Sequence, residues 1–383
     1  MGLAVQGEAQ GPVTTPSAEA AHLASTAEAG SAELEVPSPA LLSSRIAARQ
    51  TLIEPALSAP LSGPLPPGVA AALAPVDTLS AAQAATRKLA HDHYENFSVV
   101  SMLLPKRLRQ DFCNVYAFCR VADDLGDELG DPHRSFACLQ ELRSQTYACF
   151  AGERRSAVFI ALADTVARHD LPIKPFLDLI SAFEQDQRNF RYETFEQLAD
   201  YCTRSADPVG RLVLYLCGYR DEVRQRLSDQ TCTALQLANF WQGVRGDWLE
   251  RRRIYLPQDS MDRFGVSPQQ VKEARFDSRF RELVRFEVHR AWAMFDEGDQ
   301  LLPTLDRSVR LQISLFGRGG RAILKAIRRQ NYDTLSRQPK LSRWRKTRLA
   351  CGVLFDATLQ TMHNTLVGSS RPSHRAKPSE AAG

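Results

Sequence analysis

The chain has 383 residues, 44% of them hydrophobic, so it can bury a large core. A net charge of +4 is too small to indicate a nucleic-acid-binding protein. The eight cysteines form no CxxC pair and no zinc-like spacing with histidine, which favours free thiols in a reducing cytosol. The first Lys or Arg is Arg45 and no apolar run has transmembrane length, so we expect a cytoplasmic protein without signal or transit peptide.

Both ends of the chain are rich in small residues and proline. Residues 1–80 consist mainly of Ala, Pro, Ser and Gly, as in LSAPLSGPLPPGVAAALAP, and residues 369–383 are similar. Such segments bury too little apolar surface to offset the entropy lost on ordering. We therefore predict two disordered tails around one domain of residues 81–368.

The pattern of this domain is helical almost throughout, because apolar residues recur at intervals of three and four while strand-like alternation is weak. The first candidate, residues 77–97, has Asp77 or Ser80 as its expected N-cap. The later candidates are residues 109–129, 175–190, 207–219, 233–244 and 281–302. Pro208 and Gly210 are expected to interrupt regular helix between residues 205 and 210. The fold class is therefore predicted to be all-α.

An acidic stretch, ADDLGDE at residues 122–128, carries the sharpest chemical signal. Asp123 and Asp127 are four residues apart, so their carboxylates share one helix face and repel each other unless a cation lies between them. Carboxylate oxygens suit Mg²⁺, which commonly bridges protein acids to a substrate phosphate. Arg120, one turn earlier, suits an anion bound to that metal. A solvated acidic helix end is the alternative interpretation.

A second polar stripe lies about 120 residues later, in NFWQGVRGDW. Asn239, Gly243 and Asp247 are spaced four apart and therefore fall on one face of a helix. The stripe offers an amide, then no side chain, then a carboxylate. It is either an incomplete metal site or a face that something approaches closely at Gly243.

These tracts resemble the squalene and phytoene synthase family, the head-to-head prenyl-diphosphate synthases, from about residue 85 to residue 345. The tracts ENFSV, YCTRSADPVG and NFWQ are most similar to the bacterial hydroxysqualene synthase branch found with hopanoid biosynthesis. The anchoring tracts are HDHYENFSVVSMLLP, VYAFCRVADDLGDE, YCTRSADPVGRLVL, LQLANFWQGVRGDW, RRRIYLPQDSMDRFGV and GGRAILKAIRRQNYD.

The resemblance implies an isoprenoid-synthase fold, with two aspartate-rich motifs facing each other across a central cavity and two or three Mg²⁺ ions bound with diphosphate. Asp123, Asp127 and Asp247 match metal ligands, while Gly243 stands where the family has a further aspartate. We expect weaker metal binding from this loss, because diphosphate and water supply most of the ligands. The alternative is an inactive relative.

The resemblance also implies roles for other side chains. Tyr201, Arg120 and Gln242 match catalytic positions, with Gln242 expected to position a water molecule. Arg211 is a less certain phosphate ligand, because an ordinary ion pair accounts for it equally well. The expected diphosphate ligands are Arg120, Arg211, Arg253, Asn239 and Asn96, and the expected cavity walls, for which core packing is the alternative, are Phe97, Tyr116, Phe118, Phe183 and Phe240.

The implied reaction is conversion of presqualene diphosphate to hydroxysqualene, with water capturing the carbocation. No NADPH is then needed, and the sequence has no dinucleotide glycine motif, since GGR at 319–321 follows no strand. The alternatives are condensation of two farnesyl diphosphates, phytoene synthesis, or a silent subunit that binds prenyl diphosphate.

Expected partners are the prenyl diphosphate and other squalene or hopanoid pathway enzymes, and no nucleic acid. The basic residues of 318–348 indicate peripheral contact with the inner face of the membrane or a solvated basic face. Vesicle co-sedimentation would distinguish these two interpretations.

Overall fold

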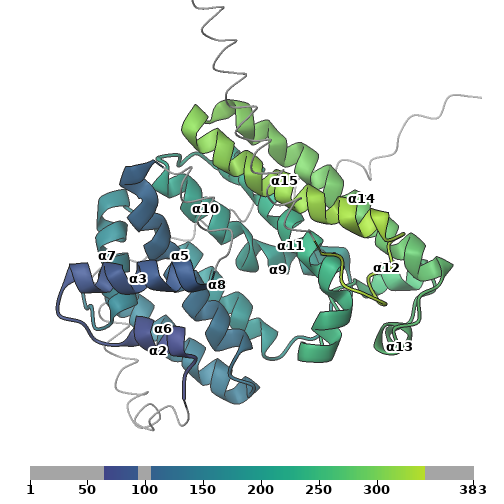
Figure 1. Cartoon of the computed structure of the whole chain (residues 1–383), viewed down its shortest axis with the longest axis horizontal. Helices are drawn as coiled ribbons and strands as arrows, with labels where there is room; N and C mark the ends of the chain where they lie inside the picture. Colours follow the sequence, from purple (N-terminus) through teal and green to yellow (C-terminus); the bar gives the residue numbers. More distant parts are fainter. Residues whose placement is uncertain (1–63, 94–104, 341–383) are drawn as a thin grey trace, which may run out of the picture. The chain divides into compact units, whose positions relative to one another are not determined.

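The computed structural model describes residues 64–93 and 105–340, and these residues form helices and connecting turns (Figure 1). The expected all-α class is confirmed for these ranges, where a single isolated bridge joins Arg191 to Ile254. The helices are α2 Pro67–Leu73, α3 Leu79–His93, η1 Lys106–Leu108, α5 Arg109–Asp127, α6 Pro132–Phe150, α7 Ala157–His169, α8 Lys174–Asp186, α9 Phe195–Ser205, α10 Asp207–Leu216, α11 Glu222–Arg251, α12 Gln258–Arg263, α13 Pro268–Lys272, α14 Ser278–Gly298, η2 Asp299–Thr304 and α15 Arg307–Arg329.

The predicted disordered tail of residues 1–80 extends too far along the chain, because helix is already present at residue 67. Residues 67–73 form α2, with Pro67 at its first position, and its residues Val69 and Ala72 are buried against the core. The helix expected at 77–97 is α3, whose first turn is capped by Thr78 rather than by Asp77 or Ser80: the backbone N–H of Ala81 donates to Thr78 Oγ1 at 3.2 Å. Residues 1–63, 94–104 and 341–383 lie outside the described residues, as do the candidates Asn96 and Phe97 and the predicted tail at 369–383.

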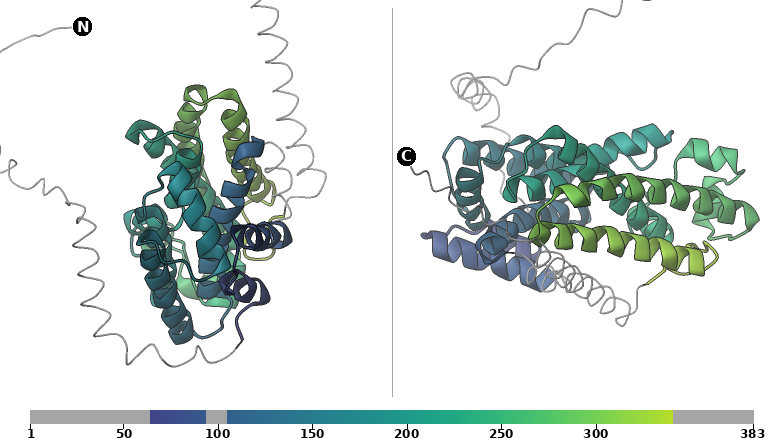
Figure 2. Two further views of the ribbon diagram at one scale, coloured as in Figure 1. Left: turned by 90° about the vertical axis from the view of Figure 1, so that its left-hand side faces the viewer. Right: turned by 90° about the horizontal axis from the view of Figure 1, so that it is seen from above.

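Two large hydrophobic clusters organise the helices. In the first, the apolar face of α5 packs among α2, α6, α7, α8 and α10. In the second, α11 packs against α9, α14 and α15, and α14 and α15 lie side by side (Figures 1 and 2). Both α5 and α11 therefore run through the buried interior, and their polar C-terminal turns project from an otherwise apolar framework.

Close helix contacts fix the position of the C-terminal turn of α5. A Cβ added to Gly126 would lie 3.1 Å from Cδ1 of Phe183 on α8, so only glycine permits this approach without a shift. At the other end of α5, buried Asp111 accepts hydrogen bonds from Arg168 and Thr165 of α7. These contacts hold α5 at both ends.

The expected break is confirmed at Ala206, whereas Gly210 lies inside α10 and does not interrupt it. The α9 helix ends at Ser205, Ala206 departs from helical geometry, and α10 begins at Asp207 with Pro208 in its first turn. Gly210 faces Cys232 and Ser228 of α11, where a Cβ would clash. The absence of a side chain at Gly210 therefore lets α10 approach α11 closely.

The basic tract at the C-terminal end is partly neutralised by its neighbours. Arg321 of α15 forms ion pairs of 2.8 Å with Asp296 and Asp299, and Lys325 lies over the ring of Trp292. Arg328 and Arg329 are exposed at the end of α15. Among the described residues, no helix is long and apolar enough to cross a membrane.

Asp207 is a buried carboxylate with a measurable consequence for stability. Burial, together with repulsion from Asp229, raises the pKa of Asp207 to about 8, although Thr233 donates a hydrogen bond to it. The folded chain then holds a proton that the unfolded chain releases above its ordinary pKa. Stability is therefore lost as pH rises from the ordinary value of 3.8 through about 8.

The variant Asp207→Asn should remove this loss. We expect its free energy of unfolding to fall less than that of the wild type between pH 6 and pH 9, by on the order of 1–2 kcal/mol. Thermal or denaturant unfolding at the two pH values measures the difference. Asp170→Asn, at an exposed carboxylate, is the matched control. An equal pH dependence in all three proteins would contradict the assignment.

Candidate active site

The C-terminal turns of α5 bring together one arginine and several carboxylates. Arg120 pairs with Asp124, with Asp123 at 3.1 Å and with Glu128 at 2.8 Å. Asp124 is buried while Asp123 keeps a side-chain exposure of 42%, so Asp123 faces the solvent side of the site. Burial raises the pKa of Asp123 to about 6, and the nearby Asp127 adds to this rise. The acidic stripe is therefore no solvated helix end.

The matching stripe on α11 is arranged as its spacing predicts. Asn239 is exposed, Gly243 is buried, and Asp247 lies one turn beyond. The carboxylate of Asp247 folds back over Gly243, because a Cβ built at position 243 would lie 2.9 Å from Asp247 Oδ2. Burial raises the pKa of Asp247 to about 7.

Two arginines at the end of α11 connect this stripe to α5. The Nε atom of Arg251 lies 3.1 Å from Asp127 Oδ2, and Nη1 of Arg253 lies 3.2 Å from Asp127 Oδ1. Arg251 also lies 3.9 Å from Asp247 Oδ1. Both carboxylate oxygens of Asp127 thus face guanidinium groups, and the two acidic stripes share one electrostatic site.

A buried acid on α8 completes the cluster. Arg253 lies 3.6 Å from Asp186 Oδ2 and donates a hydrogen bond of 2.9 Å to the Asp186 carbonyl. The Tyr201 hydroxyl on α9 donates to Asp186 Oδ2 at 2.8 Å. Burial raises the pKa of Asp186 to about 7, against the opposing effects of Arg253 and Tyr201. Within the described part of the chain, Asp186 Oδ1 is buried without a hydrogen-bond partner, so it can accept from a ligand or carry a proton.

Aromatic rings pack around the ring of Tyr201. Phe240 stacks on Tyr255 with ring centroids 3.7 Å apart, and Tyr192 lies 5.5 Å from Tyr201. Tyr201 is itself 6.3 Å from Phe240. These π-faces border Arg253 and Asp186, and π-faces favour a nearby cation. Phe240 is itself buried in the core cluster, and its role as a cavity wall stays a prediction.

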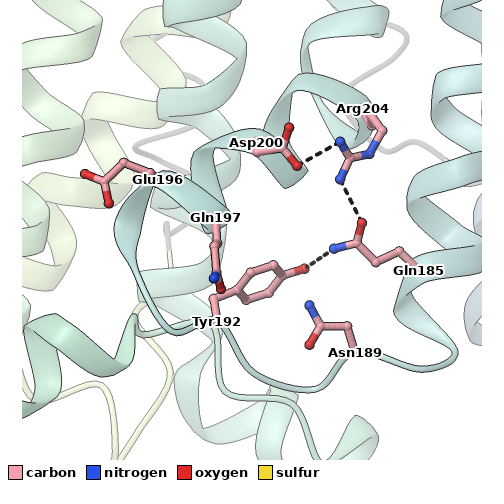
Figure 3. Close-up of a pocket in the computed structure, with 7 residues that line it drawn as sticks. All are labelled: Gln185, Asn189, Tyr192, Glu196, Gln197, Asp200 and Arg204. Atoms are coloured by element: carbon pink, nitrogen blue, oxygen red, sulfur yellow. Dashed lines mark hydrogen bonds and ion pairs between the residues drawn. The ribbon is translucent and has the colours of Figure 1, made fainter.

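A polar chain reaches this aromatic group from another direction (Figure 3). Arg204 donates to Gln185 Oε1 at 2.8 Å, and Gln185 Nε2 lies 3.4 Å from the Tyr192 hydroxyl. These hydrogen-bonded side chains belong to a pocket of about 470 Å³, lined by Gln185, Asn189, Tyr192, Glu196, Gln197, Asp200 and Arg204. Its lining residues carry amide, phenol, acidic and basic groups and include none of the expected cavity-wall residues.

Three expected site residues have other partners. Arg211 binds Asp229 through two hydrogen bonds, of 3.0 and 2.6 Å, which is the ordinary ion pair given as its alternative, and its phosphate contact stays a prediction. Gln242 donates to the carbonyl of Pro339, which occupies the amide expected to position water. Phe118 is fully buried and packs edge-on against Phe159 and Phe176, as a core residue does.

Two further expected wall residues line helix contacts. Tyr116 packs against Ala90 and Cys113 between α3 and α5. Phe183 is half-buried and packs over Gly126, close to Asp127. Neither contact shows an open cavity at these rings.

Sequence reasoning missed Asp186, Arg251 and Tyr255. Asp186 had a signal, because it continues the apolar stripe of Phe176, Leu179 and Phe183 on α8 and is therefore an acid on a buried face. Arg251 is four residues after Asp247, the spacing of a helical ion pair. Nothing local to Tyr255 indicates that it stacks on Phe240.

The donor set fits a metal ion that a phosphate helps to bind. Asp123, Asp127 and Asp247 offer hard oxygen ligands, as Mg²⁺ requires. In residues 64–93 and 105–340, however, no three His, Cys, Asp or Glu side chains are grouped so as to hold a metal by themselves. An ion here would take its other ligands from diphosphate and water.

The squalene/phytoene synthase family model matches residues 90–345, which include every element of this site. The chain belongs to the squalene/phytoene synthase family. Members of this family are head-to-head prenyl-diphosphate synthases, which assigns the chain to enzymes of isoprenoid biosynthesis. Divalent-metal dependence is typical of the family.

Known relatives support this assignment. The 15-cis-phytoene synthase of Synechococcus elongatus is 30% identical over 281 residues, covering 70% of this chain and 91% of the relative. The squalene synthase HpnC of Alicyclobacillus acidocaldarius is 46% identical with a TM-score of 0.63, covering 66% of this chain and 95% of that structure. A dehydrosqualene synthase structure is 26% identical with a TM-score of 0.67, covering 74% and 98% of the two chains. The fold is therefore the isoprenoid-synthase fold.

The buried acid of α8 gives a test of the site. Asp186→Asn preserves the side-chain volume and can still accept from Tyr201, but it removes the charge that faces Arg253. We expect a melting temperature within a few degrees of the wild type and a loss of prenyl-diphosphate turnover of about 10²-fold, the range of a proton-handling group. Turnover and thermal unfolding are measured together. Asp229→Asn, which disrupts the Arg211 pair, is the control. Full turnover by Asp186→Asn would limit Asp186 to a structural role.

Proposed function

We propose that the protein converts presqualene diphosphate to hydroxysqualene in squalene and hopanoid biosynthesis. The observation that carries this proposal is the meeting of two acidic helices at Arg251 and Arg253, beside the aromatic rings around Tyr201. Cationic groups there would receive the diphosphate, while π-faces would lie beside the carbocation. The 46% identity to a squalene synthase structure favours this branch over phytoene synthesis.

In this reaction the bond between carbon and diphosphate oxygen breaks, and the electron pair leaves with the diphosphate. A Mg²⁺ ion held by Asp123 and Asp127 would supply Lewis-acid charge to the leaving group. Arg253 would hold a phosphate oxygen, because its guanidinium is already fixed by Asp127 and Asp186. Water then adds to the rearranged cation and loses a proton, for which Asp186 Oδ1 is an acceptor.

Phytoene synthesis or farnesyl diphosphate condensation is the second candidate, and the 30% identity to a phytoene synthase favours it. A silent subunit that binds prenyl diphosphate is the third, and Gly243 motivates it. Partner enzymes of the same pathway and contact of exposed Arg328 and Arg329 with anionic lipid are further proposals.

Product analysis separates the candidates. We expect the purified chain with Mg²⁺ to release hydroxysqualene and diphosphate from presqualene diphosphate, without NADPH, as identified by mass spectrometry. The same incubation with farnesyl diphosphate alone should give no coupled product. Presqualene diphosphate or phytoene formed from shorter diphosphates would move the protein to the second candidate.

Restoring a carboxylate at position 243 tests the silent-subunit alternative. The added Cβ would meet only the mobile end of the Asp247 side chain, so the helix can accept Gly243→Asp. We expect turnover to change less than about threefold, since diphosphate supplies most metal ligands. Gly243→Asn, which adds the same volume without charge, is the control. If the wild type has near-zero turnover and Gly243→Asp, but not Gly243→Asn, raises it strongly, the result would favour the silent-subunit alternative.

A further inference from the structure

Arg251 is a cation between the two acidic helices. It is the last residue of α11, and it lies 3.1 Å from Asp127 of α5 and 3.9 Å from Asp247 of its own helix. Its side chain is 34% exposed, whereas that of Arg253 is 7% exposed. Arg251 can therefore turn toward a ligand without leaving a buried position.

The α11 side of the site has a glycine, Gly243, where the family pattern has a second carboxylate. Gly243 shares the helix face of Asp247, and the Asp247 carboxylate occupies the space above it. The α11 side thus presents a single acid opposite Asp123 and Asp127. A single carboxylate supplies only one of the several oxygen ligands that Mg²⁺ requires, so the α11 side has fewer protein ligands for an ion of its own than the α5 side has.

The charge of Arg251 acts on the whole cluster. Arg251 lies 3.1 Å from Asp127 and 3.9 Å from Asp247, so its guanidinium faces an acid of each helix. A guanidinium keeps its charge at any working pH, and its planar donors match phosphate oxygens. Arg251 thus supplies permanent positive charge at the place where the acidic stripe is incomplete.

We propose that Arg251 replaces a metal ion on the α11 side of the diphosphate site. The diphosphate is then bound by Arg251 and Arg253 on that side and by a metal ion at Asp123 and Asp127 on the other. This assignment rests on the proposed function only in taking a diphosphate as the ligand. If Arg251 takes this role, part of the affinity of the site for diphosphate does not depend on metal.

Calorimetric titration of the full chain with inorganic pyrophosphate, in EDTA and in Mg²⁺, tests the metal-independent part. In EDTA, we expect Arg251→Gln to bind pyrophosphate at least tenfold more weakly than the wild type, and Arg251→Lys to be intermediate. The matched control is Arg252→Gln at the adjacent residue, whose guanidinium lies over the Trp248 ring, and it should bind as the wild type does. Melting temperatures establish that each variant is folded.

A double variant tests the exchange of arginine for metal. Gly243→Asp combined with Arg251→Gln should lose pyrophosphate binding in EDTA and regain it within about threefold of the wild type in Mg²⁺. Electron paramagnetic resonance with Mn²⁺ and pyrophosphate should count one more bound ion per chain in this variant than in the wild type.

The inference is overturned if the wild type binds no pyrophosphate in EDTA, if Arg251→Gln binds like Arg252→Gln, or if the double variant gains no ion. These outcomes are separate from the fate of the proposed function. A chain that turns over no prenyl diphosphate but shows the Arg251-dependent affinity keeps the diphosphate subsite and loses the reaction. A chain that makes hydroxysqualene without that affinity keeps the reaction and loses the subsite.

Discussion

The buried guanidinium of Arg253 is the interaction on which the site depends. It contacts Asp127 of α5 and both the carboxylate and the carbonyl of Asp186 on α8, while its own backbone directly follows α11. Three helices are thereby fixed around one charge. Removing one partner from a buried ion pair leaves an uncompensated charge that costs roughly 3–5 kcal/mol. The geometry of the acids therefore follows from Arg253 as much as from their own helices.

The apolar framework makes this polar cluster possible. Because α5 and α11 each pack into a separate hydrophobic cluster, apolar contacts position both helices, and the arginines then join their last turns. Close contact at Gly126 brings α5 and α8 together, so that Asp127 and Asp186 can face the same arginine. Unpaired acids at such density would repel each other and favour opening. The arginines offset this repulsion. When diphosphate binds the arginines, its metal ion would offset the repulsion between the acids instead.

Local sequence was sufficient for some of this arrangement and insufficient for the rest. The stripe of Asp123 and Asp127 and the place of Asp247 follow from helical spacing, because residues four apart share a face whatever surrounds them. The partners of Arg211 and Gln242 lie 18 and 97 residues away, and no local pattern indicates such contacts.

Composition was also an incomplete guide to order. The segment around α2 has the composition of a disordered tail, yet Val69 and Ala72 are buried in the cluster around α5. Asp186 and Tyr201 form their hydrogen bond only because α8 and α9 pack together. In each of these cases a tertiary contact decides what the local sequence leaves open.

The end of α11 has a consequence for how such a site can change over time. Arg252 adopts a left-handed conformation, with φ of 57°, and its N–H and that of Arg253 close the last turn onto the carbonyls of Trp248 and Asp247. This reversal brings Arg251 and Arg253, which are two residues apart, to the two carboxylate oxygens of Asp127, while Arg251 also lies near Asp247 and Arg253 near Asp186. Deleting or inserting one residue here would reassign both cations at once, with no change of side-chain chemistry elsewhere. The length of this turn therefore decides which acids the two cations of this chain can reach.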